Sequence, residues 1–312
     1  KLQIIEVDEE DTSALRLKFP PSPRSGNYPV IMDGVGKTYG DHVVFKNASL
    51  TIERGDKVAF VGKNGEGKST LVKCIMNEIE HEGTLTLGHN VQIGYFAQNQ
   101  ASLLDENLTV FQTIDDVAKG DIRNKIRDLL GAFMFGSPEA SMKKVKVLSG
   151  GERTRLAMIK LLLEPVNFLI LDEPTAGLDP KQRIAIRNFI SRIAFDKIVI
   201  IATHVVSDVE FVARDVIMLK KGVIVDNAPP AELVRKIEGK VWNLPAPEGE
   251  VVELQQKYRV TNITRDDKTG DAILRVLSEE EPVSSGEKSA TTVAPTLEDY
   301  YLYVFGEESG GN

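Results

Sequence analysis

The sequence contains a single cysteine, Cys74, among 312 residues. One thiol cannot form an intrachain disulfide, so the pattern is not that of a small secreted scaffold, and we expect a cytoplasmic protein. No run of about 18 apolar residues is present, which predicts no transmembrane segment. Acidic residues outnumber basic ones by 46 to 38, for a formal net charge of −8. We therefore expect no direct DNA binding, because a sequence-independent DNA surface needs clustered Lys and Arg.

What is present is typical of a globular protein: 42% of the residues are apolar and 27% are charged. At about 150 residues per domain, the length predicts roughly two domains. The chain starts at Lys1 without a methionine or a signal-peptide pattern, so we expect a fragment or a processed piece of something longer. Residues 1–27 pass from an acidic run into a proline-rich stretch, which predicts a linker.

Residues 28–228 alternate short β-branched segments with helical patterns, as in 57–61 followed by 69–77, and 198–202 followed by 205–213. This alternation predicts an α/β domain with a largely parallel sheet. Between about 99 and 160 the alternation stops and amphipathic helical stretches take over, at 108–117 and 122–133. We expect an inserted helical subdomain there.

Residues 229–312 predict a small accessory region, with a helix at 231–237 and strands at 259–263 and 272–277. The segment from about 278 to 295 is rich in Ser, Glu, Thr and Pro, which favours a flexible loop. Thr296 and Asp299 have the spacing of a capping box that opens a last helix with aromatic residues at 300, 301, 303 and 305.

The strongest local pattern is at residues 62–69, GKNGEGKS, which fit G-x-x-x-x-G-K-[ST] between an expected strand and an expected helix. Its glycines let backbone N–H groups close around phosphates, and the helix N-terminus adds positive charge. Lys68 is expected to reach the β/γ oxygens and Ser69 to ligate Mg²⁺. The alternative is a plain glycine-rich turn, which the flanking strand and helix disfavour.

A second pattern is the apolar strand 168–172, which ends in two acids, Asp172 and Glu173. Only the first acid is needed to hold the magnesium shell. Glu173 is then available to orient and polarise a water beside the γ-phosphate. Strand ends of α/β sheets meet at the crevice where ligands bind, although an ordinary strand terminus with solvated acids is the simpler alternative.

The third pattern is LSGGER at residues 148–153, and with it the chain resembles the ATP-binding cassette (ABC) family. The resemblance implies a RecA-like P-loop NTPase core with a helical subdomain, and two cassettes that sandwich two ATP molecules. Ser149, Gly150 and Gly151, at a helix N-terminus, would then bind the γ-phosphate held by the partner cassette. The resemblance further implies that Tyr39 stacks on adenine and that Asp179 belongs to the loop crossing to the partner.

Two more positions complete the resemblance: Gln98, which would contact Mg²⁺ or water, and His204, which would hold the γ-phosphate and the attacking water. The expected catalytic residues are thus Glu173, His204 and Lys68, and the expected magnesium contacts are Ser69, Gln98 and Asp172. The residues expected to bind ATP are Tyr39, Gly62, Asn64, Gly65, Gly67, Lys68, Ser69, Thr70, Gln98, Ser149, Gly150, Gly151 and Asp179.

The two parts of the chain resemble different branches of this family. Residues 1–175 resemble the second cassette of ABC-F proteins, through 5–11 and 19–21, GEGKST at 65–70, YFAQNQ at 95–100 and VLSGGERTRL at 147–156. This implies that a first cassette precedes the linker and that the partner is the ribosome. Residues 176–306 resemble ATP-binding subunits of ABC exporters, through AGLDP at 176–180, THVVSDVE at 203–210 and PTLEDYYLY at 295–303.

The exporter resemblance implies a membrane permease as the partner and a peripheral position at the inner face of the membrane. In both cases we expect an ATPase that works with a second ABC cassette, either in a homodimer or with the missing tandem cassette.

Overall fold

In the computed structural model the described residues are 22–194, 197–210, 212–266, 270–285 and 289–306. Most of the predicted linker, including its acidic run, therefore lies outside the described residues. The described part of the linker is hydrogen-bonded to later residues. The Asn167 side-chain amide donates to the Pro23 carbonyl at 2.7 Å, and the Gly26 N–H donates to the His89 carbonyl at 2.9 Å.

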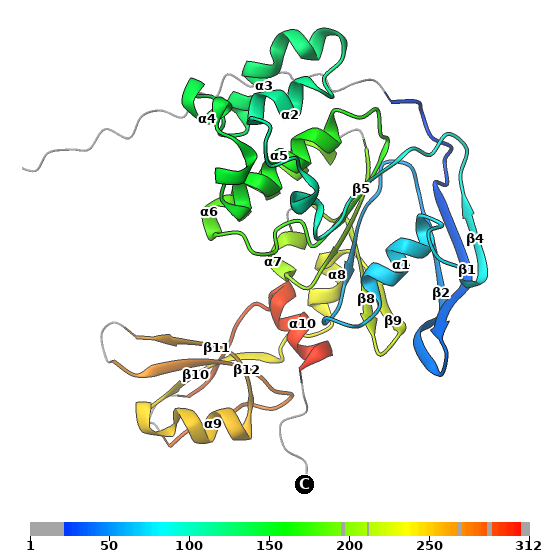
Figure 1. Cartoon of the computed structure of the whole chain (residues 1–312). Helices are drawn as coiled ribbons and strands as arrows, with labels where there is room; N and C mark the ends of the chain where they lie inside the picture. The colour runs from blue at the N-terminus through cyan, green and yellow to red at the C-terminus, as the bar shows by residue number, and fades with distance from the viewer. Residues whose placement is uncertain (1–21, 195–196, 211, 267–269, 286–288, 307–312) are drawn as a thin grey trace, which may run out of the picture. The chain divides into compact units, whose positions relative to one another are not determined.

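The centre of the fold is a six-stranded sheet with the order β5-β6-β7-β3-β8-β9 (Figure 1). All neighbours are parallel except the last pair, which confirms the largely parallel sheet that the sequence predicted. Its middle strands are buried on both faces, which explains their continuous apolar sequences. The strands are β5 (Ile93–Phe96), β6 (Phe168–Asp172), β7 (Ile198–Thr203), β3 (Lys57–Val61), β8 (Asp215–Lys220) and β9 (Val223–Ala228).

A separate three-stranded antiparallel sheet has the order β2-β1-β4 and was not predicted as such. Its strands are β1 (Val30–Tyr39), β2 (His42–Ile52) and β4 (Glu82–Leu87). Phe45 and Ile52 of this sheet share one apolar cluster with Phe60 and Phe168 of the parallel sheet. Helix α1 (Lys68–Ile75) contributes Leu71 and Ile75 to the same cluster, so its position relative to both sheets is set by packing.

Residues 99–165 form a compact unit of their own in which the described residues contain helices and no strand longer than a single bridge. Both amphipathic stretches predicted for this segment are helical, at α2 and at a 3₁₀ turn followed by α3. The helices are α2 (Val110–Asp115), α3 (Ile126–Ala132), α4 (Pro138–Met142) and α5 (Gly150–Leu162), with 3₁₀ turns at Gln100–Leu103, Gly120–Lys125 and Val145–Val147.

Residues 23–98 and 166–312 fall into the other compact unit, so the expected boundary near residue 229 stays a prediction. Beyond the strands named above, this unit has α6 (Pro180–Ile193), α7 (Val206–Val209) and α8 (Pro230–Arg235). The predicted helix at 205–213 is shorter than expected, and its residue 211 is outside the described residues.

The C-terminal region builds a four-stranded antiparallel sheet, β11-β12-β10-β13, with helix α9 along one face (Figure 1). Strands β11 (Arg259–Arg265) and β12 (Ala272–Leu277) were predicted, whereas β10 (Val241–Ala246) and α9 (Val251–Lys257) were not. A 3₁₀ turn at Glu248–Glu250 leads into α9. Leu254 of α9 packs on Leu244, Leu274 and Val276 of the sheet.

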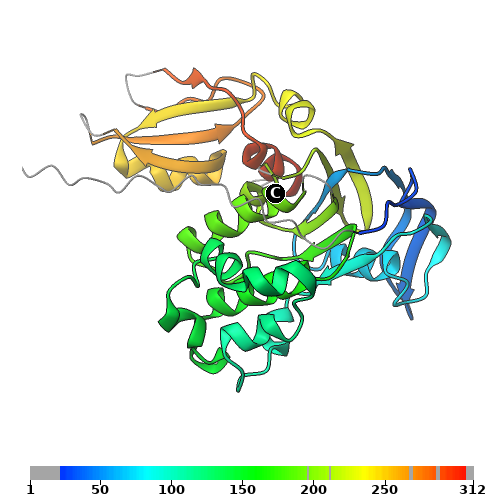
Figure 2. The ribbon, with the colours of Figure 1, turned by 90° about the horizontal axis from the view of Figure 1, so that it is seen from above.

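The segment predicted as a flexible loop contains β13 (Thr291–Thr292), and its residues 286–288 are outside the described residues. The last helix, α10 (Leu297–Phe305), begins at the predicted capping box, because Thr296 and Asp299 each accept from the other's backbone N–H. Helix α10, red in Figure 2, packs against α7 and α8. Val206, Leu233 and Tyr300 of these helices belong to one apolar cluster.

Candidate functional site

The phosphate loop, residues 62–69, connects β3 to α1 as predicted, and its glycines are required by the backbone. Gly65 and Gly67 have φ values of 88° and 91°, in the left-handed region that side chains disfavour. A Cβ on Gly62 would lie 2.5 Å from the Leu219 carbonyl oxygen, and one on Gly67 would lie 3.0 Å from Val44. Gly67 caps α1 without a side chain, so the first N–H groups of the helix face the loop.

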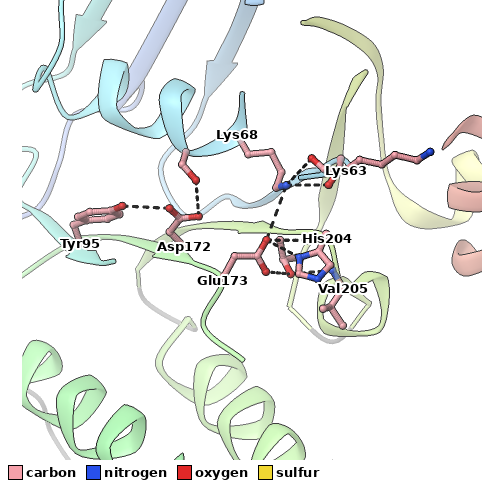
Figure 3. Close-up of polar contacts among 10 residues, drawn as sticks. Lys63, Lys68, Tyr95, Asp172, Glu173, His204 and Val205 are labelled. Carbon is pink, nitrogen blue, oxygen red and sulfur yellow. Dashed lines mark hydrogen bonds and ion pairs between the residues drawn. The ribbon is translucent and has the colours of Figure 1, made fainter. Parts of the chain in front are cut away.

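Lys68 is the buried cation of the site, with 6% of its surface exposed. Its Nζ donates to the carbonyls of Gly62 at 2.9 Å and Lys63 at 3.2 Å, and lies 3.9 Å from Glu173 Oε1 (Figure 3). Burial lowers the pKa of this ammonium, while the carboxylates of Glu173 and Asp172 act in the opposite direction. The cation is thus held at one position, next to two acids.

Asp172, at the end of β6, is joined to α1 and β5 by hydrogen bonds. The Ser69 hydroxyl donates to Oδ1 at 3.1 Å, and the Tyr95 hydroxyl donates to Oδ2 at 3.3 Å (Figure 3). Burial raises the pKa of Asp172, and the two hydrogen bonds oppose that effect. A carboxylate beside a hydroxyl supplies the hard oxygen donors that Mg²⁺ prefers, with its other positions filled by water and phosphate. The donor set therefore fits this ion.

Glu173 has φ = 49°, a left-handed conformation that is uncommon for a non-glycine residue. Its backbone N–H donates to the Ala202 carbonyl at 2.8 Å. Its carboxylate accepts from Thr203 Oγ1 and the His204 N–H, both at 3.2 Å, and lies 2.8 Å from His204 Nδ1 (Figure 3). Unusual backbone of this kind is often found at functional sites, and here it brings the acid and the imidazole together.

These groups open into a cavity of about 470 Å³, here called the phosphate-loop pocket. Most of the site residues predicted in the phosphate loop and at the strand ends line it. Gly62 and Asp172 do not line it, but they accept hydrogen bonds from Lys68 and Ser69, which do. His42 and Val44 of β2 also line it and were missed, because nothing in their local sequence points to a ligand. The lining residues are His42, Val44, Asn64, Gly65, Gly67, Lys68, Ser69, Thr70, Gln98, Glu173 and His204.

The remaining predicted residues do not line this cavity. Tyr39 ends β1 with 51% of its surface exposed, and the Lys37 ammonium lies 4.7 Å from its ring centre. Asp179 is the N-cap of α6 and accepts from the Gln182 N–H at 2.9 Å. Ser149 is the N-cap of α5, in the unit of residues 99–165, and forms a capping box with Glu152. Gly150 and Gly151 form the first turn of that helix.

A buried pair behind the site was also missed by sequence reasoning. The Thr175 hydroxyl donates to Asp208 of α7, which joins the segment after Glu173 to the segment after His204. Asp208 is 2% exposed, its pKa is raised by burial, and its second oxygen lies 3.7 Å from the Arg187 guanidinium. A Thr in an acidic loop and an Asp in a short helix give no signal of this contact until the fold is known.

The described residues contain no group of three or more His, Cys, Asp or Glu side chains placed to hold a metal ion. Among the same residues, no helix combines the length and the apolar character needed to cross a membrane.

Comparisons with known proteins agree with this geometry. Residues 45–176 match the family model described as ABC transporter. ABC transporter F family member 5 of Arabidopsis thaliana is 37% identical over 232 residues, 73% of this chain and 33% of that protein. The Uup-like ATP-binding protein of Haemophilus influenzae is 40% identical over 168 residues, 53% of this chain and 36% of that protein. The chain spans about a third of the length of these curated relatives.

Solved structures show the same fold. The cassette cbiO1 from Clostridium perfringens, described as part of the ABC transporter complex cbiONQ, has a TM-score of 0.56 and 25% identity, covering 68% of this chain and 95% of that one. The cassette MJ0796, a dimer in a post-hydrolysis state bound to ADP and Pi, has a TM-score of 0.55 and 24% identity, covering 64% and 98%. The chain therefore contains an ATP-binding cassette ATPase domain with the RecA-like P-loop fold, and residues 45–176 are the part that matches the ABC transporter family model.

Proposed function

We propose that this chain binds ATP with Mg²⁺ in the phosphate-loop pocket and hydrolyses it, paired with a second ABC cassette. The observation that carries the proposal is the convergence of Lys68, Glu173 and His204 on one cavity. A glycine-rich turn alone would need none of these three groups. Buried charge of both signs, set at fixed distances beside a helix N-terminus, is suited to stabilising transferring phosphate.

In the proposed mechanism Glu173 is the general base. Its carboxylate takes a proton from a water whose oxygen attacks the γ-phosphorus, while the bond to the ADP oxygen breaks and phosphate leaves. Lys68 stabilises the negative charge on the transferring group, and His204 positions the γ-phosphate beside Glu173. Magnesium, when bound, neutralises charge on the phosphate oxygens, and Ser69, Gln98 and Asp172 would hold it.

The other predicted residues would act at the edges of this site. The loop amides of residues 62–70 would enclose the phosphates, and Tyr39 would stack on adenine. Ser149, Gly150, Gly151 and Asp179 would act across the pair, toward the nucleotide of the second cassette. Support for a pair comes from the dimer in the description of MJ0796, which holds ADP and Pi.

The test of hydrolysis is phosphate release from ATP in the presence of Mg²⁺. Asp172→Asn is nearly isosteric and can still accept from Ser69, but it removes the negative charge proposed to hold the magnesium shell. We expect turnover to fall by about 10²-fold or more, while Asp33→Asn, an exposed acid outside the pocket, leaves it unchanged. Equal turnover in the two variants would contradict the proposed magnesium site.

For the process driven by ATP, we propose an ABC-F-like role at the ribosome. The support is sequence similarity: the relatives from Arabidopsis thaliana carry the ABC-F name, at 37% and 36% identity. The motifs that resemble ABC-F proteins lie in residues 1–175, which include the helical unit and Gln98.

The second candidate is an ATP-binding subunit that energises a separate membrane permease. It is favoured by the C-terminal region, whose last helix carries the exporter-like sequence, and by similarity to cbiO1, described as part of a transporter complex. The ribosomal role places the chain in the cytoplasm, and the permease role places it at the inner face of the membrane.

A pull-down separates the two candidates. Glu173→Gln should hold ATP without cleaving it, and so preserve the ATP-bound complex during capture from lysate containing ribosomes and solubilised membranes. ATP-dependent recovery of ribosomes supports the first candidate. ATP-dependent recovery of a multi-span permease supports the second and contradicts the first.

A further inference from the structure

A second cavity, of about 360 Å³, lies in the C-terminal region, and we call it the accessory pocket. Its polar lining comes from the residue before β10, the end of α9, the start of β11, the two residues after β12 and from α10. The residues that matter here are Lys240, Lys257, Tyr258, Arg259, Glu279 and Tyr303. Its volume lies within the range of sites for small molecules, about 300–1,000 Å³.

Strand register brings the cations of this pocket together from distant parts of the sequence. Val241 of β10 and Arg259 of β11 both pair with Leu277 of β12, so Lys240 and Arg259 flank the end of the same strand. With Lys257, three cations and one carboxylate, that of Glu279, line the pocket. The lining carries a net charge of +2 in a chain whose formal charge is −8.

Contacts hold these cations in place. The Lys240 ammonium lies 5.3 Å from the Tyr303 ring centre, the Lys257 ammonium lies 5.1 Å from that of Tyr258, and the Arg259 guanidinium donates to the Tyr303 carbonyl at 3.0 Å. The counter-charge is weakly held by comparison. Glu279 lies 2.7 Å from Lys240, but 66% of its side chain is exposed, and ion pairs of this kind are easily exchanged for another anion.

We propose that the accessory pocket binds a small phosphorylated molecule, whose phosphate takes the place of Glu279 beside Lys240, Lys257 and Arg259. A phosphomonoester carries a charge of about −1.5 to −2 at pH 7, so beside the three cations it brings more negative charge than the single carboxylate of Glu279 that it replaces. Guanidinium geometry favours phosphate, and the two tyrosine rings provide apolar walls for the rest of the ligand. This inference goes beyond the ATPase proposal and does not depend on it.

The chain carries its own reporter for this pocket. Trp242 is its sole tryptophan, and the indole N–H donates at 3.1 Å to the carbonyl of Ser278, a residue of the pocket wall. The experiment titrates the full chain with phenyl phosphate at constant ionic strength and follows Trp242 emission. Benzoate, which has a similar ring and a single negative charge, is titrated in parallel.

We expect a saturable change with phenyl phosphate and none with benzoate. Lys257→Gln and Arg259→Gln should each weaken binding about tenfold or more, whereas Arg265→Gln, an exposed arginine outside the pocket, should not. Lys68→Ala should leave the response intact, which separates this site from the phosphate loop. The proposal is overturned if the wild-type emission does not saturate, if benzoate binds equally well, or if both pocket variants bind like wild type.

Discussion

The phosphate-loop pocket and the accessory pocket are both lined by cations, but they differ in how those cations are held. Lys68 is 6% exposed and lies between backbone carbonyls and the carboxylates of Asp172 and Glu173. The side chain of Lys240 is 28% exposed, and its carboxylate partner is largely in solvent. Burial strengthens electrostatic interactions and fixes geometry, which bond cleavage requires. The difference therefore separates a pocket arranged for chemistry from one suited to reversible binding.

The sharpest way to test this contrast is to remove the buried cation. Lys68→Ala should lower ATP affinity by about 10–10²-fold, because a hydrogen bond to a charged group contributes about 1.5–3 kcal/mol. Lys63→Ala removes a cation from the same loop, and its exposed side chain is directed away from Glu173 (Figure 3), so it should have little effect. Titration with a fluorescent ATP analogue measures both. A similar loss in the two variants would mean that charge in the loop, and not its burial, decides affinity.

In the accessory region Arg275 forms an ion pair with the buried carboxylate of Asp299, and breaking it should be costly. Arg275 donates to both oxygens of Asp299, at 2.9 Å and 2.7 Å, beside the hydroxyls of Thr261 and Thr296. Asp299→Asn leaves Arg275 without its counter-charge and should lower the free energy of unfolding by about 3 kcal/mol. Denaturation followed by Trp242 emission measures it, with the exposed neighbour Glu298→Gln as control.

The same pair predicts a pH dependence. Burial opposes ionisation of Asp299, but the bonds from Arg275 and Thr296 outweigh it, so its pKa lies below the ordinary 3.8. A carboxyl whose pKa is lowered by folding stabilises the native state fully at pH values above its pKa in the unfolded chain. That contribution is lost as the pH falls through its pKa in the folded protein. Wild type should therefore lose its advantage over Asp299→Asn as the pH falls below about 3.8. A stability difference that is constant with pH would contradict this.

A smaller effect is expected at Tyr95. Its hydroxyl helps to position Asp172, and removing it leaves the charge of Asp172 unchanged. Tyr95→Phe removes one hydrogen bond to Asp172, worth about 0.5–1.5 kcal/mol, and keeps the ring. The Mg²⁺ concentration for half-maximal turnover should rise about two- to tenfold, with little change in stability. Tyr28→Phe, at an exposed tyrosine, is the control. An unchanged magnesium dependence would show that Tyr95 only packs.

The two pockets also differ in how far the sequence predicted them. Lys68 and Ser69 were predicted because the strand, the phosphate loop and the helix follow one another in the sequence. A short sequence motif is therefore enough to indicate how these two residues are placed. Glu173 was predicted because it follows the buried apolar strand β6, whereas His204, directly after β7, was predicted from the resemblance to the ABC family. Tyr95 was not assigned a role because its hydroxyl meets Asp172 only through parallel pairing of β5 with β6.

The accessory pocket could not be predicted, since its cations come from separate segments joined by antiparallel register. Strand β10 was missed for a local reason: it contains Pro245, which argues against a central strand. In the described residues β13 pairs only with Trp242 and Asn243, so Pro245 lies where β10 is an edge. Helix α9 was missed because it is seven residues long and buries only Leu254.

The most direct test of the account is single-turnover cleavage of ATP already bound to the protein with Mg²⁺. Wild type, Glu173→Gln and the exposed control Glu53→Gln are compared after their ATP affinities have been measured. If Glu173 is the general base, Glu173→Gln binds ATP as tightly as wild type and cleaves it about 10²–10⁴-fold more slowly, and the control matches wild type. Cleavage by Glu173→Gln at the wild-type rate would contradict the assignment.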